Sequence, residues 1–230
     1  MKHLILAYVL AVLPVMPACA GSIALNGIAG GGNYNVSVTS FKERLFKTVY
    51  RQQFDFSCGS AALASLLTFH YEDNVNEQHV FLDMYRHGDQ EKIKKLGFSL
   101  LDMKLYLERK GYSSDGFRIN LDQLTKANVP AITIINNNGY MHFVLIKGVS
   151  DTEVLVGDPA VGVKAIDRDK FSEIWNHRIL FLIHDKQELA ANHFQDRREW
   201  ALRVKAPLGT AVDRSSLADF NLLQPGNFDL

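Results

Sequence analysis

The sequence predicts an α+β fold in which a helical N-terminal part packs on a C-terminal antiparallel sheet. Apolar residues recur at helical spacing in segments between residues 57 and 127, whereas β-rich runs joined by short turns follow from residue 130 to 183. Helices followed by a meander of strands are typical of α+β domains. The 230 residues are 47% hydrophobic and 22% charged, which is enough for one sizeable core with extensions.

The first 20 residues are typical of a secretory signal peptide. A short basic start precedes an apolar run over residues 4–12, and Ala18-Cys19-Ala20 places small residues at the two recognition positions before a cut. We therefore expect residues 1–20 to be removed, the mature chain to begin at Gly21, and the protein to be periplasmic.

Two other interpretations of this segment fit less well. An uncleaved anchor helix would need a longer apolar run, and Pro14 and Pro17 interrupt the run that is present. A lipoprotein signal would end at Cys19, but Met16 and Pro17 are poor matches before it. After cleavage Cys58 is the single cysteine, and an odd cysteine in an oxidising compartment favours a reactive thiol over a disulfide.

The segments before the sheet contain several helix signals. Residues 21–33 are rich in Gly, Ala and Asn and predict a flexible linker, and weak alternation over residues 33–40 indicates an edge strand. The central helix should begin near Ser57, its expected N-cap, and extend to about His70, buried on more than one side. Further helices are expected at residues 76–85, at 99–110 with Ser99 and Asp102 as a cap and Gly111 as the stop, and at 120–127.

From Pro130 the apolar period changes from helix to strand. The turn Asn136-Asn137-Asn138-Gly139 is of hairpin type, and Ser150-Asp151 makes a second turn. Strands are expected at residues 130–135, 140–149, 153–157, 163–166 and 178–183, with a short helix at 169–175. After Asp185 the chain is charged and partly helical, with Trp200 and Leu202 as possible contacts, and then becomes typical of a poorly ordered tail.

The charge and histidine patterns argue against two classes of function. The chain has 25 basic and 25 acidic residues, so its zero net charge gives no global attraction to nucleic acid or to an anionic membrane. His70, His79 and His87 are eight or nine residues apart, the wrong spacing for a compact metal site on one helix. We therefore expect neither a metal nor a cofactor, and no nucleic-acid partner.

The position of Cys58, at the start of the expected central helix, is typical of a nucleophile. In the first turn of a buried helix, backbone N–H groups and the positive end of the helix dipole favour a thiolate. His142 opens the run His-Phe-Val-Leu-Ile within the strand expected at 140–149, where it shares one face with Val144 and Ile146, so a helix packed on that face would bring the imidazole to the thiol. Asp158 ends the next strand, at the same end of the hairpin as His142.

Gln52 lies six residues before Cys58, where its amide could complete an oxyanion hole with the Cys58 N–H. Gln53 competes for this role, but the spacing favours Gln52. Asp151 and Asp167 could also orient a histidine, although both have the character of turn residues. An isolated cysteine in an apolar helix is more often a core residue, and only the accompanying glutamine, histidine and aspartate favour a nucleophile.

These residues resemble the papain-like bacteriocin-processing peptidases, the double-glycine leader peptidases best known as N-terminal domains of peptide-exporting ABC transporters. The resemblance covers about residues 49–183 and implies a papain-like fold and a cysteine endopeptidase. It implies that Cys58 attacks a leader peptide, His142 is the base, Asp158 orients it, and Gln52 supports the oxyanion. The motifs that carry it are Gln52-x5-Cys58-Gly59, Gly97-Phe-Ser-Leu-Leu-Asp-Met, His142-Phe-Val, Asp158-Pro-Ala-Val-Gly162 and Phe171…Trp175.

The context differs from the usual members of that family. The signal peptide, with no ATPase or membrane-spanning part in the sequence, indicates a stand-alone, exported version, and Ser57 replaces the usual acidic residue before the cysteine. This is similar to the peptidase-like accessory protein of functional-amyloid secretion systems, which implies an outer-membrane secretion apparatus and amyloid subunits as partners. Residues 30–32, three glycines, suit a self-processing site, but a flexible linker is the favoured interpretation.

The sequence thus predicts a periplasmic cysteine peptidase that cleaves a peptide or protein substrate linked to secretion. The expected organisation is a signal peptide (1–20), a lead-in (21–48), a papain-like peptidase domain (49–184) and a C-terminal extension (185–230). A peptidase-fold accessory that binds an exported chain with little turnover is the alternative. The spacing of Gln52 and the Asp158-Pro-x-x-Gly context argue against a transglutaminase-like or cell-wall amidase domain.

Overall fold

The computed structural model describes residues 22–26, 33–37, 40–54, 56–175 and 178–202. The chain divides into two units, one up to Arg44 and one from Leu45 onward. The expected signal peptide, the three glycines at 30–32 and the chain beyond residue 202 lie outside the described residues.

The first unit contains a two-stranded antiparallel sheet. Strand β1 (Ser22–Asn26) pairs with β2 (Asn33–Ser37), and α1 (Phe41–Leu45) follows. The predicted flexible linker over 21–33 is therefore wrong at β1. The register places Ile23 opposite Val36 and Leu25 opposite Tyr34, so apolar alternation, which was predicted only for β2, is present in both segments.

The second unit is built on an antiparallel sheet. Its described strands are β3 (Ser114–Phe117), β4 (Ala131–Asn137), β5 (Tyr140–Val149), β6 (Glu153–Asp158), β7 (Gly162–Asp167) and β8 (Leu180–Ile183). Their order across the sheet is β3-β8-β4-β5-β6-β7. The central hairpin β4–β5 turns through Asn138 and Gly139, both at positive φ (53° and 92°), which suits a two-residue turn.

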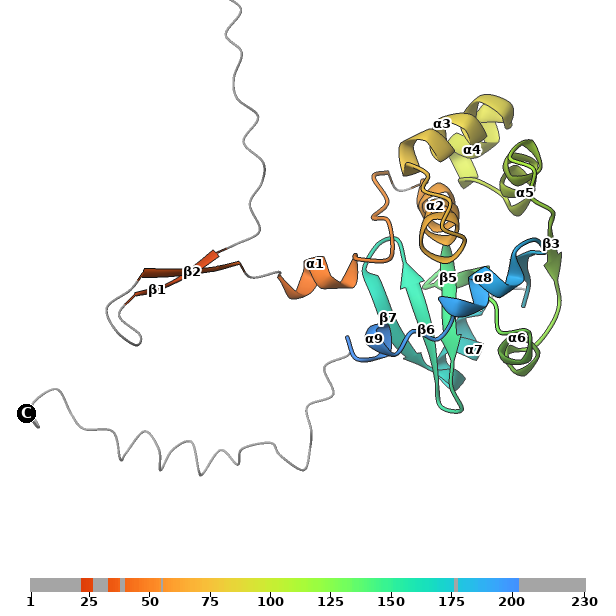
Figure 1. The fold of residues 1–230 in the computed structure, drawn as a ribbon. Coiled ribbons are helices and arrows are strands. Elements are labelled where there is room, and N and C mark those ends of the chain that lie inside the picture. The colour runs from red at the N-terminus through yellow and green to blue at the C-terminus, as the bar shows by residue number, and fades with distance from the viewer. Residues whose placement is uncertain (1–21, 27–32, 38–39, 55, 176–177, 203–230) are drawn as a thin grey trace, which may run out of the picture. The chain divides into compact units, whose positions relative to one another are not determined.

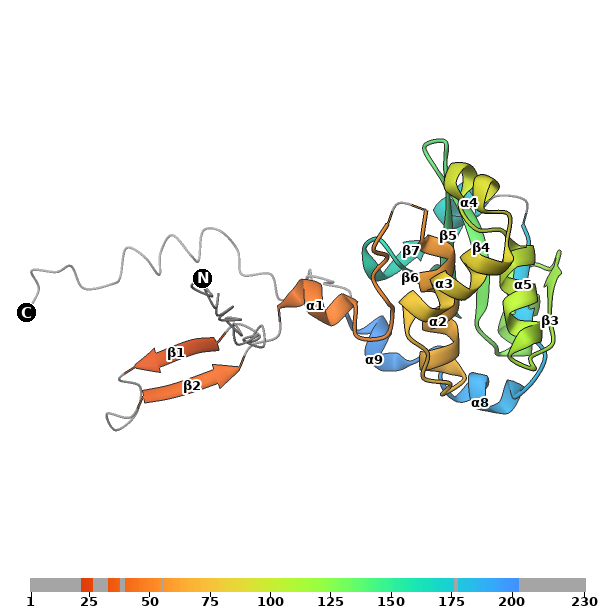
Figure 2. The ribbon, with the colours of Figure 1, turned by 90° about the horizontal axis from the view of Figure 1, so that it is seen from above.

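Helices cover both faces of this sheet, as Figures 1 and 2 show. The buried helix α2 (Cys58–His70) packs Leu63 and Leu67 against Phe143 and Leu145 of β5. The helices α3 (Glu77–His87), α4 (Gln90–Leu96) and α5 (Leu100–Arg109) lie beyond α2. The opposite face carries α6 (Leu121–Ala127) and α7 (Arg168–Ile174).

Side-chain caps set most of the predicted helix ends. Ser99 and Asp102 form the expected capping box at α5, and Asn120 forms one with Gln123 at α6. Two elements of the second unit, α4 and β3, were not predicted from the sequence. Helix α4 is short and mostly charged, and β3 is a polar edge strand, so neither has the apolar periodicity on which the predictions relied.

The C-terminal extension contributes two short helices, α8 (Gln187–Asn192) and α9 (Arg197–Trp200). Trp200 and Leu202 pack against a small cluster of Val49, Leu155 and Val163, so these two predicted contacts are confirmed. In the part of the chain that the structure describes, no helix is both long and apolar enough to cross a membrane.

Replacing Ser99 with alanine is expected to lower the free energy of unfolding by about 1 kcal/mol, because the Asp102 N–H loses its acceptor, Ser99 Oγ, whereas the bond from the Ser99 N–H to Asp102 Oδ2 is retained. Urea denaturation measures the effect. Ser99→Asp, which keeps an acceptor at the cap, should lose less. Equal stability of wild type and Ser99→Ala would show that the cap does not stabilise α5.

Candidate active site

Cys58 is the first residue of α2 and is 5% exposed. The backbone N–H groups of a first helical turn have no acceptor within the helix. The next residue must be small, because a Cβ at Gly59 would stand 3.0 Å from Met103 Cε and 3.1 Å from Phe98 Cβ. The same Cβ would stand 3.5 Å from Phe143 Cδ2, so α2 and β5 begin side by side.

Ser57 occupies the N-cap position of α2, but its side chain does not cap the helix. Its Oγ accepts hydrogen bonds from the N–H groups of Gln53 and Phe54, at 3.2 and 3.1 Å, and donates to the Phe54 carbonyl. The prediction of a side-chain cap is therefore wrong. The hydroxyl turns back because the preceding tight loop offers two donors and an acceptor, and it fixes the loop between Gln52 and Cys58.

His142 and Asp158 form a buried pair at the start of β5 and the end of β6. The imidazole Nε2 donates to Asp158 Oδ1 at 2.7 Å, and the two residues are 5% and 3% exposed. The other ring nitrogen, Nδ1, is buried and has no hydrogen-bond partner among the described residues. Cys58 lies within interaction range of this imidazole. With Nε2 bound to the carboxylate, Nδ1 is the nitrogen left for the thiol.

The route by which the imidazole reaches the thiol differs from the expected one. Val144 and Ile146 belong to the cluster under α6 and α7, whereas α2 packs on the alternate residues Phe143 and Leu145. The predicted shared face of His142, Val144 and Ile146 is therefore not the face that α2 covers. His142 meets Cys58 because both residues lie at the ends of their elements, where α2 and β5 begin together.

The Asp158 carboxylate is held by further partners. Its Oδ1 also accepts the Ala160 N–H at 2.9 Å, and its Oδ2 binds Lys164 Nζ at 2.7 Å. Lys164 was not predicted as a site residue, although its place two residues after Gly162 on the next strand was a usable signal. Asp151 lies in the turn at the far end of the hairpin, and Asp167 caps α7, so neither competes for His142.

These contacts shift the pKa values of both residues. Burial lowers the pKa of His142, but the hydrogen bond to Asp158 and the interaction with Cys58 outweigh it and raise that pKa to about 9. Burial acts to raise the pKa of Asp158, yet the hydrogen bonds from His142 and Lys164 hold it well below its usual range. The pair is therefore an imidazolium and a carboxylate at neutral pH.

The structure separates the two candidate glutamines. The Gln52 N–H donates to the carbonyl of Pro159, next to Asp158, at 3.0 Å. Its side-chain Oε1 is buried and has no hydrogen-bond partner among the described residues. Gln53 instead turns toward α3, where its Oε1 accepts a hydrogen bond from Gln78 at 3.2 Å. Gln52 is thus the glutamine that lies by the His142–Asp158 pair.

A cavity of about 950 Å³ opens beside Cys58. Its walls come from the α4–α5 connection and the β4–β5 hairpin, and they include the exposed apolar residues Leu96, Leu101, Tyr140 and Met141. A cavity of this size beside a thiol can hold an extended or helical peptide segment.

The histidines that were judged unsuited to a metal site are dispersed. His70 is 1% exposed in the core, and His79 and His87 lie on the surface. Among the described residues, no group of three or more His, Cys, Asp or Glu side chains could hold a metal ion. Cys58, His142 and Asp158 place a thiol, an imidazole and a carboxylate together, the set that transfers acyl groups.

Comparison with known proteins gives consistent matches. The profile of the peptidase C39 family matches residues 47–188. The chain is 33% identical over 212 residues to the "Probable functional amyloid protease FapD" of Pseudomonas fluorescens. The alignment covers 92% of this chain and 94% of the relative. It is 38% identical over 183 residues to the protein of the same name from Pseudomonas aeruginosa, with 80% of each chain covered.

Among solved structures, the peptidase domain of Streptococcus ComA, described as a bi-functional ABC transporter involved in quorum sensing, is similar with a TM-score of 0.50. The two chains are 19% identical, and the match covers 59% of this chain and 96% of that domain. At this identity the similarity establishes a shared fold and nothing more.

The pKa of His142 can be tested by following its imidazole resonances in an NMR titration. We expect a midpoint near 9 in the wild type and a midpoint lower by at least about one unit in Asp158→Asn. Burial lowers the pKa of His142, and the variant lacks the carboxylate that raises it. Asp151→Asn, at the far end of the hairpin, should leave the midpoint unchanged. A wild-type midpoint near the ordinary value of 6.5 would contradict the described pairing.

The same shift affects stability. The native pKa of His142 lies above its unfolded value, so the protonated pair stabilises the fold fully below pH 6.5. That contribution is lost as the pH rises through about 9. The difference in unfolding free energy between wild type and Asp158→Asn should shrink over this range.

Proposed function

Because this chain belongs to the peptidase C39 family, we propose that it is a cysteine peptidase with Cys58 as nucleophile, His142 as base, Asp158 as orienting group and Gln52 as oxyanion donor. The resemblance to double-glycine leader peptidases and the papain-like α+β fold are confirmed by the family match and the similar structures. The observation that carries the proposed roles is the buried His142–Asp158 bond, with Nδ1 left free beside Cys58 at the start of α2.

The geometry supports a two-step acyl transfer. The Cys58 thiolate attacks the carbonyl carbon of the scissile bond, and the displaced electron pair moves to the carbonyl oxygen. That oxyanion is held by the Cys58 backbone N–H and the Gln52 amide. When the C–N bond breaks, the His142 imidazolium gives its proton from Nδ1 to the leaving amine. Water, deprotonated by His142, then hydrolyses the thioester and releases the thiolate.

Asp158 keeps the imidazole oriented through both steps. A buried carboxylate that accepts the Nε2 proton fixes the ring and stabilises its charged form. Lys164 and the Ala160 N–H hold the carboxylate from the sides that His142 does not occupy. A pKa of about 9 leaves His142 charged at neutral pH, which suits a proton donor to the leaving amine.

We propose that the substrate is a peptide or protein linked to secretion, acted on in the periplasm. The support is the signal-like sequence of residues 1–20 and the name of the two Pseudomonas relatives, which describes a functional amyloid protease. Amyloid subunits and an outer-membrane secretion apparatus are the partners proposed on the same basis. The cavity beside Cys58 is the place for the substrate segment.

The nucleophile and the oxyanion donor have separable effects on cleavage. With secreted proteins of the source organism as substrates, Cys58→Ala should abolish cleavage, and Gln52→Ala should lower kcat by about 10²–10³-fold. Gln53→Ala is the matched control and should cleave at the wild-type rate, because Gln53 binds Gln78 away from the site. Electrophoresis and mass spectrometry of the products give both the rate and the position of the cut.

The alternative function is a peptidase-fold accessory that binds an exported chain without turnover. It would be supported if wild type and Cys58→Ala restored secretion equally and neither produced a cut. The peptidase proposal fails in that case.

The cavity gives a prediction about substrate binding. Leu101, 61% exposed in the first turn of α5, lines the wall near Cys58. Leu101→Asp should raise KM roughly tenfold or more through lost apolar burial, with kcat little changed. Leu82→Asp, an equally polar change on α3 away from the cavity, should leave KM unchanged. Equal KM values for all three proteins would exclude this wall from the substrate site.

A further inference from the structure

The segment Thr48–Gln52, here called the lead segment, carries the candidate oxyanion donor and is anchored at alternate residues. The Tyr50 N–H donates to Ser65 Oγ of α2 at 2.8 Å, and the Gln52 N–H donates to the Pro159 carbonyl at 3.0 Å. Thr48 provides the third anchor at the start of the segment. The lead segment is thus anchored at three points, of which Thr48 is the first along the chain.

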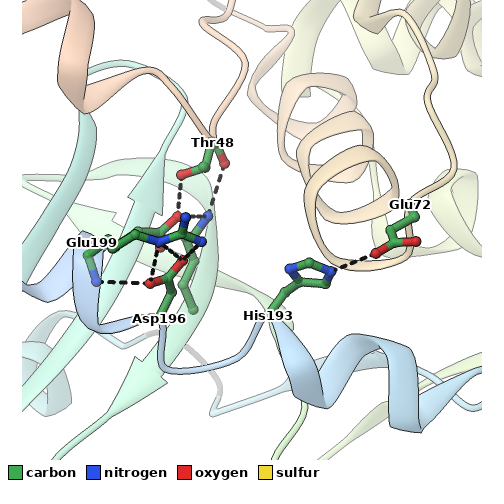
Figure 3. Close-up of polar contacts among 7 residues, drawn as sticks. Thr48, Glu72, His193, Asp196 and Glu199 are labelled. Carbon is green, nitrogen blue, oxygen red and sulfur yellow. Dashed lines mark hydrogen bonds and ion pairs between the residues drawn. The ribbon is translucent and has the colours of Figure 1, made fainter.

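Thr48 is held by a buried ion pair. Lys147 lies on β5 where its register against β6 shifts, and its Nζ is 3.0 Å from the Thr48 carbonyl and 2.8 Å from Glu199 Oε1. The Thr48 hydroxyl donates to the same Glu199 oxygen (Figure 3). Lys147 and Glu199 are 1% and 7% exposed. A single α9 carboxylate thus binds both the lead segment and the strand that carries His142.

Glu199 belongs to the segment of residues 187–202, here called the strap. The strap lies along β5: Gln195 N–H donates to the Lys147 carbonyl at 2.7 Å, and a Cβ at Gly148 would stand 3.2 Å from Trp200. Just after α8, His193 bonds Glu72, which follows α2, at 3.0 Å (Figure 3). Attachments to both α2 and β5 fix the strap on the peptidase domain.

Because the ion pair at Thr48 is buried, its contribution to stability depends strongly on its geometry. A buried ion pair is stabilising only while its geometry is kept and its remaining hydrogen bonds are made. Val49, next to Thr48, is 1% exposed and packs with Leu155 and Val163, against which Trp200 also packs. The ion pair and the apolar cluster thus hold the first two residues of the lead segment, Thr48 and Val49.

We propose that the strap, most of which lies beyond the family match at residues 47–188, sets the position of Gln52 through the Glu199–Thr48 contact. Glu199 is a positioning residue, since it acts on the reaction only through the lead segment. The inference rests on the proposed oxyanion role of Gln52. Oxyanion donors lose their effect when they are misplaced by about 1 Å, so a distant anchor can change the rate.

A double-mutant cycle tests this proposal with the full chain. Glu199→Gln, which keeps the acceptor oxygen but removes the charge, should lower kcat about tenfold in the wild-type background. In a Gln52→Ala background the same change should lower kcat less than about twofold, because the residue through which Glu199 acts is absent. Arg198→Ala is the control, since that exposed neighbour pairs only with Asp196 among the described residues. Equal losses in both backgrounds, or no loss in the first, would overturn the proposal.

A second variant separates positioning from stability. Lys147→Met combined with Glu199→Leu replaces the buried ion pair with apolar side chains. Such a replacement often leaves the stability equal to that of the wild type or higher. It also removes both side chains that hold Thr48. We expect a wild-type melting temperature, a wild-type rate of Cys58 alkylation by iodoacetamide, and kcat still about tenfold low. Recovery of kcat together with stability would show a purely structural role and overturn the proposal.

Hydrogen exchange decides the question even if no substrate is cleaved. Glu199→Gln should speed exchange of the Tyr50 and Gln52 amides about tenfold or more, while Arg198→Ala should not. If wild type shows no Cys58-dependent cleavage but exchange changes as stated, the peptidase function fails and the strap still positions the lead segment. Unchanged exchange in Glu199→Gln would overturn the strap proposal, whatever the activity.

Discussion

The buried carboxylate of Asp158 is the interaction on which the candidate site depends. A carboxylate that is 3% exposed has lost its water, so it persists as an anion only if neighbouring groups replace that hydration. His142, Lys164 and the Ala160 N–H do so from β5, from β7 and from the turn between β6 and β7. Three neighbouring segments of the sheet are thereby tied to one side chain. The same bonds orient the imidazole and keep it charged.

Close packing at the start of α2 brings the thiol to this pair. Gly59 lets α2 approach Phe98 and Met103 to distances that a methyl group would fill, and it sets the first turn of α2 against Phe143. The Ser57 hydroxyl, although it is no cap, ties the loop that joins Gln52 to the helix. Cys58 and His142 therefore come from two elements that start at one place, and the lead segment supplies Gln52.

Local signals in the sequence predicted most of the fold. The strand bounds of β5 were predicted to the residue, and the caps at Ser99 and Asn120 were visible because a side chain bonds the backbone three residues on. Elements without apolar periodicity, α4 and β3, were missed. The alternation argument for His142 chose the wrong face, because a period of two gives relative faces and does not say which one a helix covers.

The sequence by itself determined the family and the class of chemistry. Both follow from motif residues and their spacing, in the chain order Gln52, Cys58, His142 and Asp158. Only the tertiary structure decided which glutamine faces the pair, that Lys164 holds Asp158, and that Glu199 reaches Thr48 across 151 residues. These contacts join residues on different elements. Burial and close packing select them, and neither quantity can be read from local periodicity.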